Sequence, residues 1–429
     1  EGSDLIVADG QTVTYGSPTL RFTHRTARVT IVLTDYTEGL ASVQLTGLST
    51  EGGNPAEITP YDKGSNTYTA LVAPQSVVAG TAFITCTFTN GKTFVYKMKN
   101  ATDWQAGGEY TYTVSLTAAK DPGYTIEGNG SYTVTSADGL MHVADLVNGG
   151  KTDINITLDK NIDLTGKGWT PIGTSFDNSY KGTFDGGGHT ITGLAVTTND
   201  QFVGLFGYLN RAGTVKNVVM EGIQITSNHM FGNTGGVAGF SWGTIENCSV
   251  SGSVSGTVYV GGVVGAQWGG SITGCSSSAT VKGTVDVGGV AGQTNSSATL
   301  TACYATGNVT IEIAPKKNIA GGGLVGMNAG SSLLACYATG NVTSTGSSTG
   351  YVHIGGFLGN NYTTVTACYW KNNHEQGIGY NKKSTEATKV DGTGVTWKNA
   401  VDAMNTALQN AGSKWRYELK GALPTLRKQ

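Results

Sequence analysis

A short glycine motif, two glycines followed by two apolar residues and a third glycine, recurs through the second half of the chain and restricts its fold most strongly. Complete copies begin 26 to 34 residues apart, at Gly235, Gly261, Gly288, Gly322 and Gly355, and Gly204-Leu205-Phe206-Gly207 is a shortened first copy. A unit of this length cannot bury its own apolar face, so the copies must stack on one another. Because Thr, Ser, Val and Gly dominate the copies, we predict a β-solenoid, either a right-handed β-helix or a β-roll.

Cysteine follows the same repeat. Five of the six cysteines lie 9 to 11 residues after the closing glycine of a copy (Cys248, Cys275, Cys303, Cys336 and Cys368), and Val218 takes that place in the first copy. A position that accepts Val or Cys is small, apolar and buried, so stacked copies should align these side chains in an internal ladder of free thiols. Disulfides between neighbouring coils are the alternative, although five cysteines cannot all pair.

The first part of the chain has the sequence pattern of a β-sandwich. Alternating apolar residues run from Leu20 to Leu33 with one change of parity, which predicts a strand with a bulge or bend and one buried face. Further alternating stretches are separated by Gly, Pro and Asn, and they lie near residues 42–48, 67–73, 81–88, 92–98 and 109–116.

Helical periodicity occurs at two places only, Asp138 to Val147 and Trp397 to Leu408. Both lie at the ends of the predicted solenoid, where a covering element would protect unpaired sheet edges. We therefore predict an all-β chain in which a β-sandwich (1–120), a linker (121–132), a solenoid with an N-terminal cap (133–395) and a C-terminal helical cap (396–429) follow one another.

Two stretches resemble known bacterial families. The repeats resemble the GLUG motif of bacterial surface proteins. The first domain is similar to the fimbrillin-like proteins of Bacteroidetes in the strand from Leu20 to Val29, in the Pro-Gln pair within Ala70 to Gln75, and in the closing strand from Tyr110 to Leu116. The resemblance implies a lipid-anchored precursor exported to the outer surface, a role in cell adhesion, and other fimbrial subunits as partners.

Charge and hydropathy exclude several functions. Lys and Arg number 27 against 29 Asp and Glu, so the chain lacks the basic surface that nucleic-acid binding requires. No run of 18 apolar residues predicts a transmembrane segment. The start at Glu1 agrees with an exported precursor that was trimmed, or with a chain that was cut there.

Catalytic patterns are nearly absent. Between Gly235 and Trp370 the acids are Glu246, Asp286 and Glu312. The best pair for a carbohydrate-active enzyme is Asp286 with Glu312, if adjacent coils bring them together, and two solvated loop acids are the alternative. His374-Glu375 begins like a zinc-protease motif, but the second histidine is missing and Ile378 stands in its place. We expect no metal and no cofactor.

Aromatic and amide side chains give the candidate binding residues. Three positions after the closing glycine, successive copies carry Trp242, Trp268, Asn295, Ala329 and Tyr362. Aromatic faces bordered by amides such as Asn328 suit sugar rings, so Trp242, Trp268, Tyr362, Asn295 and Asn328 are the predicted ligand-binding residues. A second row, Tyr304, Tyr337 and Tyr369, follows the cysteines and should point outward, where it either packs or binds.

The sequence favours a non-enzymatic cell-surface adhesin. Its solenoid would bind a glycan or a surface protein, and its N-terminal domain would serve anchoring or fimbrial assembly. A carbohydrate-active enzyme and a structural spacer without a ligand remain alternatives.

Overall fold

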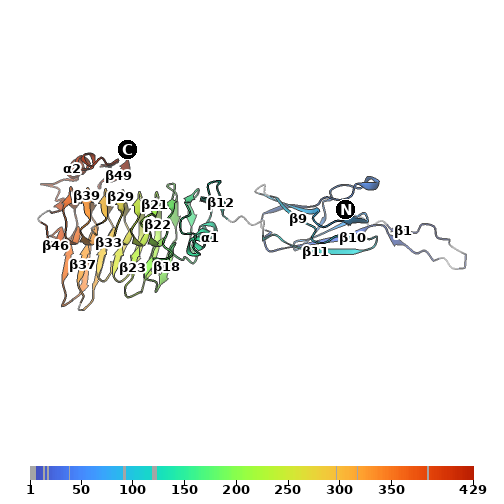
Figure 1. The fold of residues 1–429 in the computed structure, drawn as a ribbon, viewed down its shortest axis with the longest axis horizontal. Helices are drawn as coiled ribbons and strands as arrows, with labels where there is room; N and C mark the ends of the chain where they lie inside the picture. The colour runs from blue at the N-terminus through green and yellow to red at the C-terminus, as the bar shows by residue number, and fades with distance from the viewer. Residues whose placement is uncertain are drawn as a thin grey trace. The chain divides into compact units, whose positions relative to one another are not determined.

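The computed structural model describes residues 6–12, 15–16, 19–37, 39–89, 93–117, 123–295, 297–315, 317–383 and 386–429. The chain divides into two compact units, Glu1–Asp121 and Pro122–Gln429 (Figure 1). In the part of the chain that the structure describes, no helix combines the length and the apolar character needed to cross a bilayer.

The first unit packs small sheets around one apolar core. Its two larger sheets have the strand orders β11-β3-β6-β5 and β4-β8-β9, and a 3₁₀ helix, η1, covers Glu51–Gly53. The strands are β1 (Ile6–Val7), β2 (Thr23–His24), β3 (Ala27–Thr34), β4 (Leu40–Leu45), β5 (Tyr61–Gly64), β6 (Thr67–Val72), β7 (Gln75–Val77), β8 (Ala82–Phe88), β9 (Thr93–Lys97), β10 (Thr102–Trp104) and β11 (Glu109–Ser115). Phe83 and Trp104 are fully buried in the core. These sheets confirm the predicted all-β sandwich.

The alternating burial expected between Leu20 and Leu33 is confirmed only for the second half of this stretch, which forms strand β3. Ala27, Val29, Ile31 and Leu33 are buried, as predicted. Leu20 and Phe22 lie before the strand and are 47% and 59% exposed, so the prediction of a buried face was wrong for this part. The reason is that β2 pairs with β1 and not with the core sheets.

The second unit is a β-solenoid with four parallel sheets. The first sheet has ten strands, β12 (Tyr124–Ile126), β13 (Tyr132–Val134), β14 (Ile156–Leu158), β16 (Thr183–Asp185), β21 (Thr214–Lys216), β25 (Thr244–Glu246), β29 (Ser271–Thr273), β34 (Thr299–Thr301), β39 (Ser332–Leu334) and β44 (Val365–Thr366). Only β12 in this sheet is antiparallel to its neighbour. Because β12 belongs to the solenoid, part of the predicted linker is in fact structured; residues 118–122 lie outside the described residues.

The second sheet has thirteen strands, β15 (Ile162–Asp163), β17 (Thr190–Thr192), β18 (Ala195–Thr198), β22 (Val219–Ser227), β26 (Ser249–Ser255), β30 (Ser276–Ser277), β31 (Thr280–Gly283), β35 (Tyr304–Ala305), β36 (Val309–Ile313), β40 (Tyr337–Ala338), β41 (Val342–Gly346), β45 (Tyr369–Trp370) and β47 (Thr388–Lys389). The six-stranded sheet contains β19 (Phe202–Val203), β23 (Asn233–Gly235), β27 (Tyr259–Gly261), β32 (Asp286–Gly288), β37 (Ile319–Gly322) and β42 (Val352–Gly355). The seven-stranded sheet contains β20 (Phe206–Leu209), β24 (Ala238–Ser241), β28 (Val264–Gln267), β33 (Ala291–Asn295), β38 (Val325–Ala329), β43 (Leu358–Asn361) and β46 (Ile378–Asn381).

Register between the coils places equivalent residues side by side. Val215, Ile245, Ile272, Leu300, Leu333 and Val365 form one continuous inward column. The five cysteines beside this column are buried and free, which confirms the predicted internal thiols. Each sulfur lies near a main-chain carbonyl; Cys303 Sγ, for example, is 3.4 Å from the Ile272 oxygen of the preceding coil. Burial raises the pKa of Cys248, Cys303 and Cys368.

The residue before each of the five coil cysteines, and before Val218 in the first copy, turns the chain with a positive φ. The type of residue at this position depends on what covers the turn. Asn217 and Asn247, with φ of 56° and 53°, are joined by a 2.8 Å side-chain hydrogen bond. Ala302 and Ala335 have φ of 54° and are fully buried under the C-terminal segment. At Gly274 a Cβ atom would lie 2.3 Å from the Trp415 ring, so only glycine fits.

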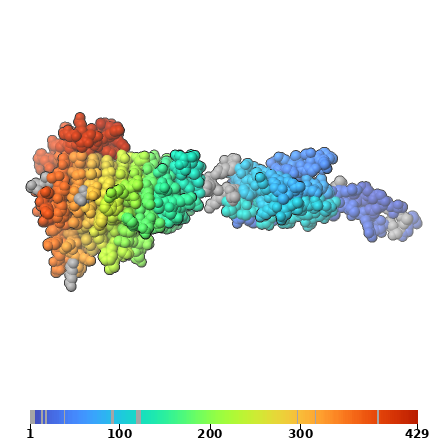
Figure 2. Space-filling model, viewed as in Figure 1, coloured from blue at the N-terminus to red at the C-terminus, as the bar shows by residue number. Residues whose placement is uncertain are grey.

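The two helices confirm the predicted helical segments but differ in what they cover. Helix α1 (Ala137–Asn148) lies at the N-terminal end of the coils (Figure 1) and buries Leu140 and Val143 in the solenoid core. Helix α2 (Trp397–Asn410) and the hairpin of β48 (Trp415–Glu418) and β49 (Thr425–Lys428) lie along the side of the coils (Figure 2), so the predicted C-terminal end cap is instead a lateral cover.

The lateral cover explains the row of tyrosines. Tyr304 and Tyr337 stack with ring centroids 4.8 Å apart, and Tyr337 is fully buried between the coils and the cover. Tyr417 donates a 2.9 Å hydrogen bond to the Ala335 carbonyl. Lys428 Nζ reaches Glu246 at 2.5 Å, near the middle of the solenoid. The row points outward as predicted, and the lateral cover packs over it.

The thiols should be inert in the folded protein. All six cysteines are buried and unpaired, and burial raises the pKa of Cys86 in the first unit to about 11. We expect no reaction with a thiol-reactive disulfide reagent under native conditions and six equivalents of reaction in denaturant. Rapid native labelling of any coil cysteine would contradict the internal ladder.

Gly274→Ala should loosen the lateral cover. The new methyl group would displace the Trp415 ring, at a cost of about 1–3 kcal/mol. The expected result is faster hydrogen exchange in residues 397–428, measured by mass spectrometry. Gly222→Ala is the matched control, because Gly222 also has positive φ (63°) but has no atom within 4 Å of the added carbon. Equal exchange in the two variants would show that backbone strain, and not contact with Trp415, is responsible.

Candidate binding site

Two columns of side chains face each other on the outside of the solenoid. One column, two positions before each glycine motif, runs along the six-stranded sheet through Phe202, Asn233, Tyr259, Asp286, Ala320 and His353. The other, one position after each motif, runs along the seven-stranded sheet through Tyr208, Phe240, Ala266, Gln293, Met327, Asn360 and Tyr380. We call them the facing columns.

The closing glycine of the motif brings the facing columns together. A Cβ atom on Gly292 would lie 2.4 Å from the Val260 nitrogen and 2.7 Å from the Asp286 oxygen, so the main chains of the two sheets touch there. Side chains seven residues apart therefore meet across the bend. His353 Nδ1 lies 2.6 Å from Asn360 Oδ1, and Gln293 Nε2 lies 3.4 Å from Asp286 Oδ2.

Toward the N-terminal end, aromatic rings fill the space between the facing columns. Tyr208 and Phe240 stack at 4.8 Å, and Phe202 contacts both rings edge-on. Phe240 also contacts Trp268, with centroids 5.2 Å apart. This aromatic cluster fills the bend between the facing columns.

Toward the C-terminal end, the facing columns enclose a pocket of about 530 Å³. Its lining includes Tyr259, Asp286, Gln293, Ile319, Met327, Tyr351, His353, Asn360, Tyr362 and Tyr380. Room is left here because Ala320, the smallest residue of its column, separates Asp286 from His353. Four tyrosine rings and one histidine ring thus surround a pocket that also contains the amides of Gln293, Asn318 and Asn360.

Of the residues described by the structure, Asp286 is the one acid that lines this pocket. It is 6% exposed, and burial raises its pKa from 3.8 to about 7, although a hydrogen bond from Gln293 opposes the shift. Gln293 in turn accepts a 2.8 Å hydrogen bond from the Trp268 indole. Among the residues that the structure describes, no Lys or Arg forms an ion pair with Asp286.

Three of the predicted binding residues lie near the facing columns. Trp242 and Trp268 are half-buried and meet edge-to-face at 6.2 Å, and Arg211 lies over the Trp242 ring at 5.3 Å. Tyr362 lines the pocket directly, and Lys382 lies 5.8 Å from its ring centroid.

The two predicted asparagines lie differently. Asn295 is half-buried at the end of β33 and pairs in register with Ala329. Asn328 is fully buried within the wall, where its amide bonds to Asn361 and to the Ser331 carbonyl. The Asn328 amide therefore bonds to groups within the solenoid wall, and this side chain does not reach the outer surface.

The predicted acid pair for catalysis is not assembled. Asp286 lies on β32 in the six-stranded sheet, whereas Glu312 lies on β36 in the thirteen-stranded sheet and forms a 2.8 Å ion pair with Lys282. Adjacent coils bring equivalent positions together, and these two acids are not at equivalent positions.

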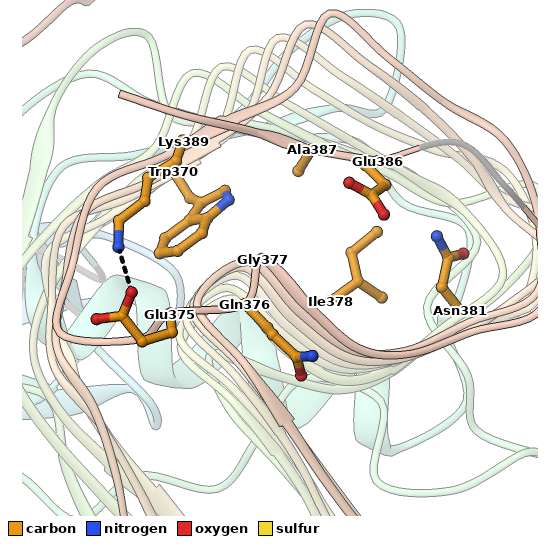
Figure 3. A pocket seen from close by; sticks show the side chains of 9 residues that line it. All are labelled: Trp370, Glu375, Gln376, Gly377, Ile378, Asn381, Glu386, Ala387 and Lys389. Atoms are coloured by element: carbon orange, nitrogen blue, oxygen red, sulfur yellow. Dashed lines mark hydrogen bonds and ion pairs between the residues drawn. The ribbon is translucent and has the colours of Figure 1, made fainter. Parts of the chain in front are cut away.

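A further pocket of about 290 Å³ lies inside the ring of the last coil (Figure 3). Trp370, Ile378 and Ala387 point into the ring, and Lys389 lies 4.8 Å from the Trp370 ring centroid and 3.3 Å from Glu375. Its wall continues the solenoid core, so we attribute it to coil stacking.

The sequence could have revealed the facing columns. Aligning the copies on the glycine motif places Asp286 with His353 and Gln293 with Asn360, two and one positions outside the motif. The positions three residues after the motif carry Trp242 and Trp268, which lie at the edge of the site.

Comparisons with known proteins agree with the two-part fold. Residues 1–129 match the fimbrillin-like family, and residues 232–255 and 256–282 match the GLUG motif. The chain combines a fimbrillin-like domain with GLUG repeats. These matches indicate a protein of the surface or adhesion type, and the fimbrillin-like and GLUG families themselves are non-enzymatic.

Relatives share only parts of the chain. Halomucin of Haloquadratum walsbyi is 40% identical over 101 residues, which are 23% of this chain and 1% of that protein. A protein of Evansella cellulosilytica described as a Gly-rich membrane protein is 35% identical over 97 residues, 22% of this chain and 11% of its own length. A Bacteroides ovatus crystal structure described as an immunoglobulin A1 protease has a TM-score of 0.54 at 17% identity, over 70% of this chain and 93% of that one. At this identity the likeness concerns the fold alone.

Replacing Asp286 with Asn should stabilise the protein most at high pH. The folded state keeps a proton on Asp286 up to about pH 7, whereas the unfolded chain loses it near pH 3.8. Stability of the natural protein therefore falls as pH rises through this window, by roughly 3 kcal/mol between about pH 5 and pH 8.5. Thermal melting at both pH values should show a gain for Asp286→Asn that is larger at pH 8.5. Glu312→Gln, an exposed acid of the same solenoid, is the control; an equal gain there would contradict the assignment to Asp286.

Proposed function

We propose that the chain is a non-enzymatic cell-surface adhesin whose solenoid wall binds glycans. The observation that carries the proposal is the half-buried Trp242–Trp268 pair beside the aromatic cluster of Tyr208 and Phe240. Flat aromatic faces stack on the apolar faces of sugar rings, and nearby amides such as Asn295 and Gln293 can bond to the hydroxyl groups. The site is preformed, so binding orders little of the protein.

The repetition of the wall supports adhesion through many weak contacts. Aromatic side chains recur along the facing columns from Phe202 to Tyr380, on strands held by continuous main-chain hydrogen bonds. A long polymer could contact several of these positions at once, and linked weak contacts raise the overall affinity.

The fimbrillin-like domain would anchor the protein or join it to other fimbrial subunits. Its match to the family supports this role, as does the apolar surface of Ile6, Leu20 and Phe22 around β1 and β2, which are 49%, 47% and 59% exposed. Exposed apolar side chains on this scale favour contact with a partner. We also place the protein at the cell surface, with a lipid-anchored precursor.

Removal of the tryptophan pair should weaken glycan binding. We expect neutral polysaccharides to change the tryptophan fluorescence of the full chain, and Trp242→Ala with Trp268→Ala to reduce affinity by about tenfold or more, because stacking contributes on the order of 1–2 kcal/mol. Tyr61→Ala, which removes a 66% exposed ring from the first unit, is the control and should bind normally.

Two outcomes would oppose this proposal. Failure of every glycan, matrix protein and cell type to bind would favour a structural spacer. Release of reducing sugar from a polysaccharide panel, abolished by Asp286→Asn, would establish an enzyme.

A further inference from the structure

The pocket between the facing columns has a chemistry distinct from that of the tryptophan face. A carboxyl group with little exposure forms part of its lining, together with several aromatic rings. Tyr351 stacks on His353 at 5.7 Å, His353 stacks on Tyr380 at 5.0 Å, and Tyr380 contacts Tyr362 at 5.9 Å. These rings form one continuous aromatic wall of the pocket.

The charges around Asp286 make this arrangement unusual. The titratable groups that share the pocket are Tyr259 from β27, His353 from β42 and Tyr380 from β46, together with Tyr351 and Tyr362 beside these strands. No Lys or Arg is among the pocket residues that the structure describes, and Lys382 lies beyond the Tyr362 ring. A buried acid is costly in its charged form unless a cation accompanies it.

A ligand can supply that cation. Ammonium groups are attracted to the faces of aromatic rings, and more strongly to a carboxylate in a site of low dielectric constant. Such a ligand would also draw the proton from Asp286, because a neighbouring positive charge favours the carboxylate. Without a cation beside it, Asp286 is mostly protonated below about pH 7, whereas an ammonium ligand would hold it as a carboxylate in an ion pair.

The other residues that line the pocket indicate which kind of molecule bears the ammonium group. Gln293, Asn318 and Asn360 place amides around the pocket, and these groups match hydroxyls better than the apolar stem of a lysine side chain. The volume of about 530 Å³ has room for a sugar ring lying between the tyrosines.

We propose that this pocket binds an amino sugar with a free ammonium group, with Asp286 as the counter-ion and the tyrosine rings as the walls. The proposal rests on the proposed function in taking a sugar as the carrier, but it does not require the tryptophan face to bind glycans. It makes the solenoid selective for glycans whose hexosamines are not acetylated.

Calorimetric titration of the full chain tests this. Glucosamine should bind about tenfold more tightly than glucose or N-acetylglucosamine, which lack the charge. Asp286→Asn should remove this preference, and Tyr380→Leu, which changes an exposed ring of the wall, should weaken glucosamine severalfold. Tyr61→Ala, in the first unit, should leave glucosamine binding unchanged, and the preference for glucosamine over glucose should persist in Trp242→Ala, which separates this proposal from the tryptophan face.

Acidification provides a second measurement. Lowering the pH from about 7 to about 5.5 should weaken glucosamine and leave glucose unaffected, because protonated Asp286 offers no counter-charge. His353→Gln, which removes the other ionisable ring on the facing columns near Asp286, should retain the effect, and Asp286→Asn should lose it.

The outcomes that overturn the proposal are specific. Equal affinity for glucose, full glucosamine binding in Asp286→Asn, or no binding at roughly 50 mM glucosamine would each refute an amino-sugar site. Tighter binding of an Nα-acetyl-lysine amide than of glucosamine would identify a protein side chain as the ligand instead.

Discussion

Main-chain hydrogen bonds between successive coils hold equivalent residues of this solenoid beside one another. Every coil repeats the register of its neighbour, so the column from Val215 to Val365 remains inside and the facing columns remain outside. A close approach of two sheets at glycines such as Gly292 forms the bend that brings the facing columns together. A side chain there would separate the sheets, and the outer site would open with them.

Much of the solenoid was predictable because its copies share residue types at equivalent positions as well as a similar length. The glycine motif predicts a bend, and the occurrence of Val218 and five cysteines at one position of the repeat predicts that this position points inward. Both inferences depend on local periodicity, which a single sequence displays. The strands of the first unit were predictable for the same reason, apart from Leu20 and Phe22, whose alternation resembles a buried strand although no core lies beneath them.

The candidate site was only partly predictable. Trp242 and Trp268 were predictable because large aromatic residues stand out among small ones, but the surroundings of Asp286 depend on Ala320 and Met327 in the next coil. The placement of α2 depends on contacts between residues far apart in the sequence, such as Tyr417 with Ala335. Periodicity alone indicated a helix there and gave no information on which surface it covers.

The lateral cover changes the mechanics of the solenoid. A repeat array held only by nearest neighbours can fray from its end, one coil at a time. Here Trp415 rests on the turn at Gly274, and Lys428 is paired with Glu246, so the last residues of the chain bridge several coils like a brace. Coils under this brace must separate together, and a pulling force on the C-terminal segment would first peel the brace away before it reached the hydrogen bonds between coils.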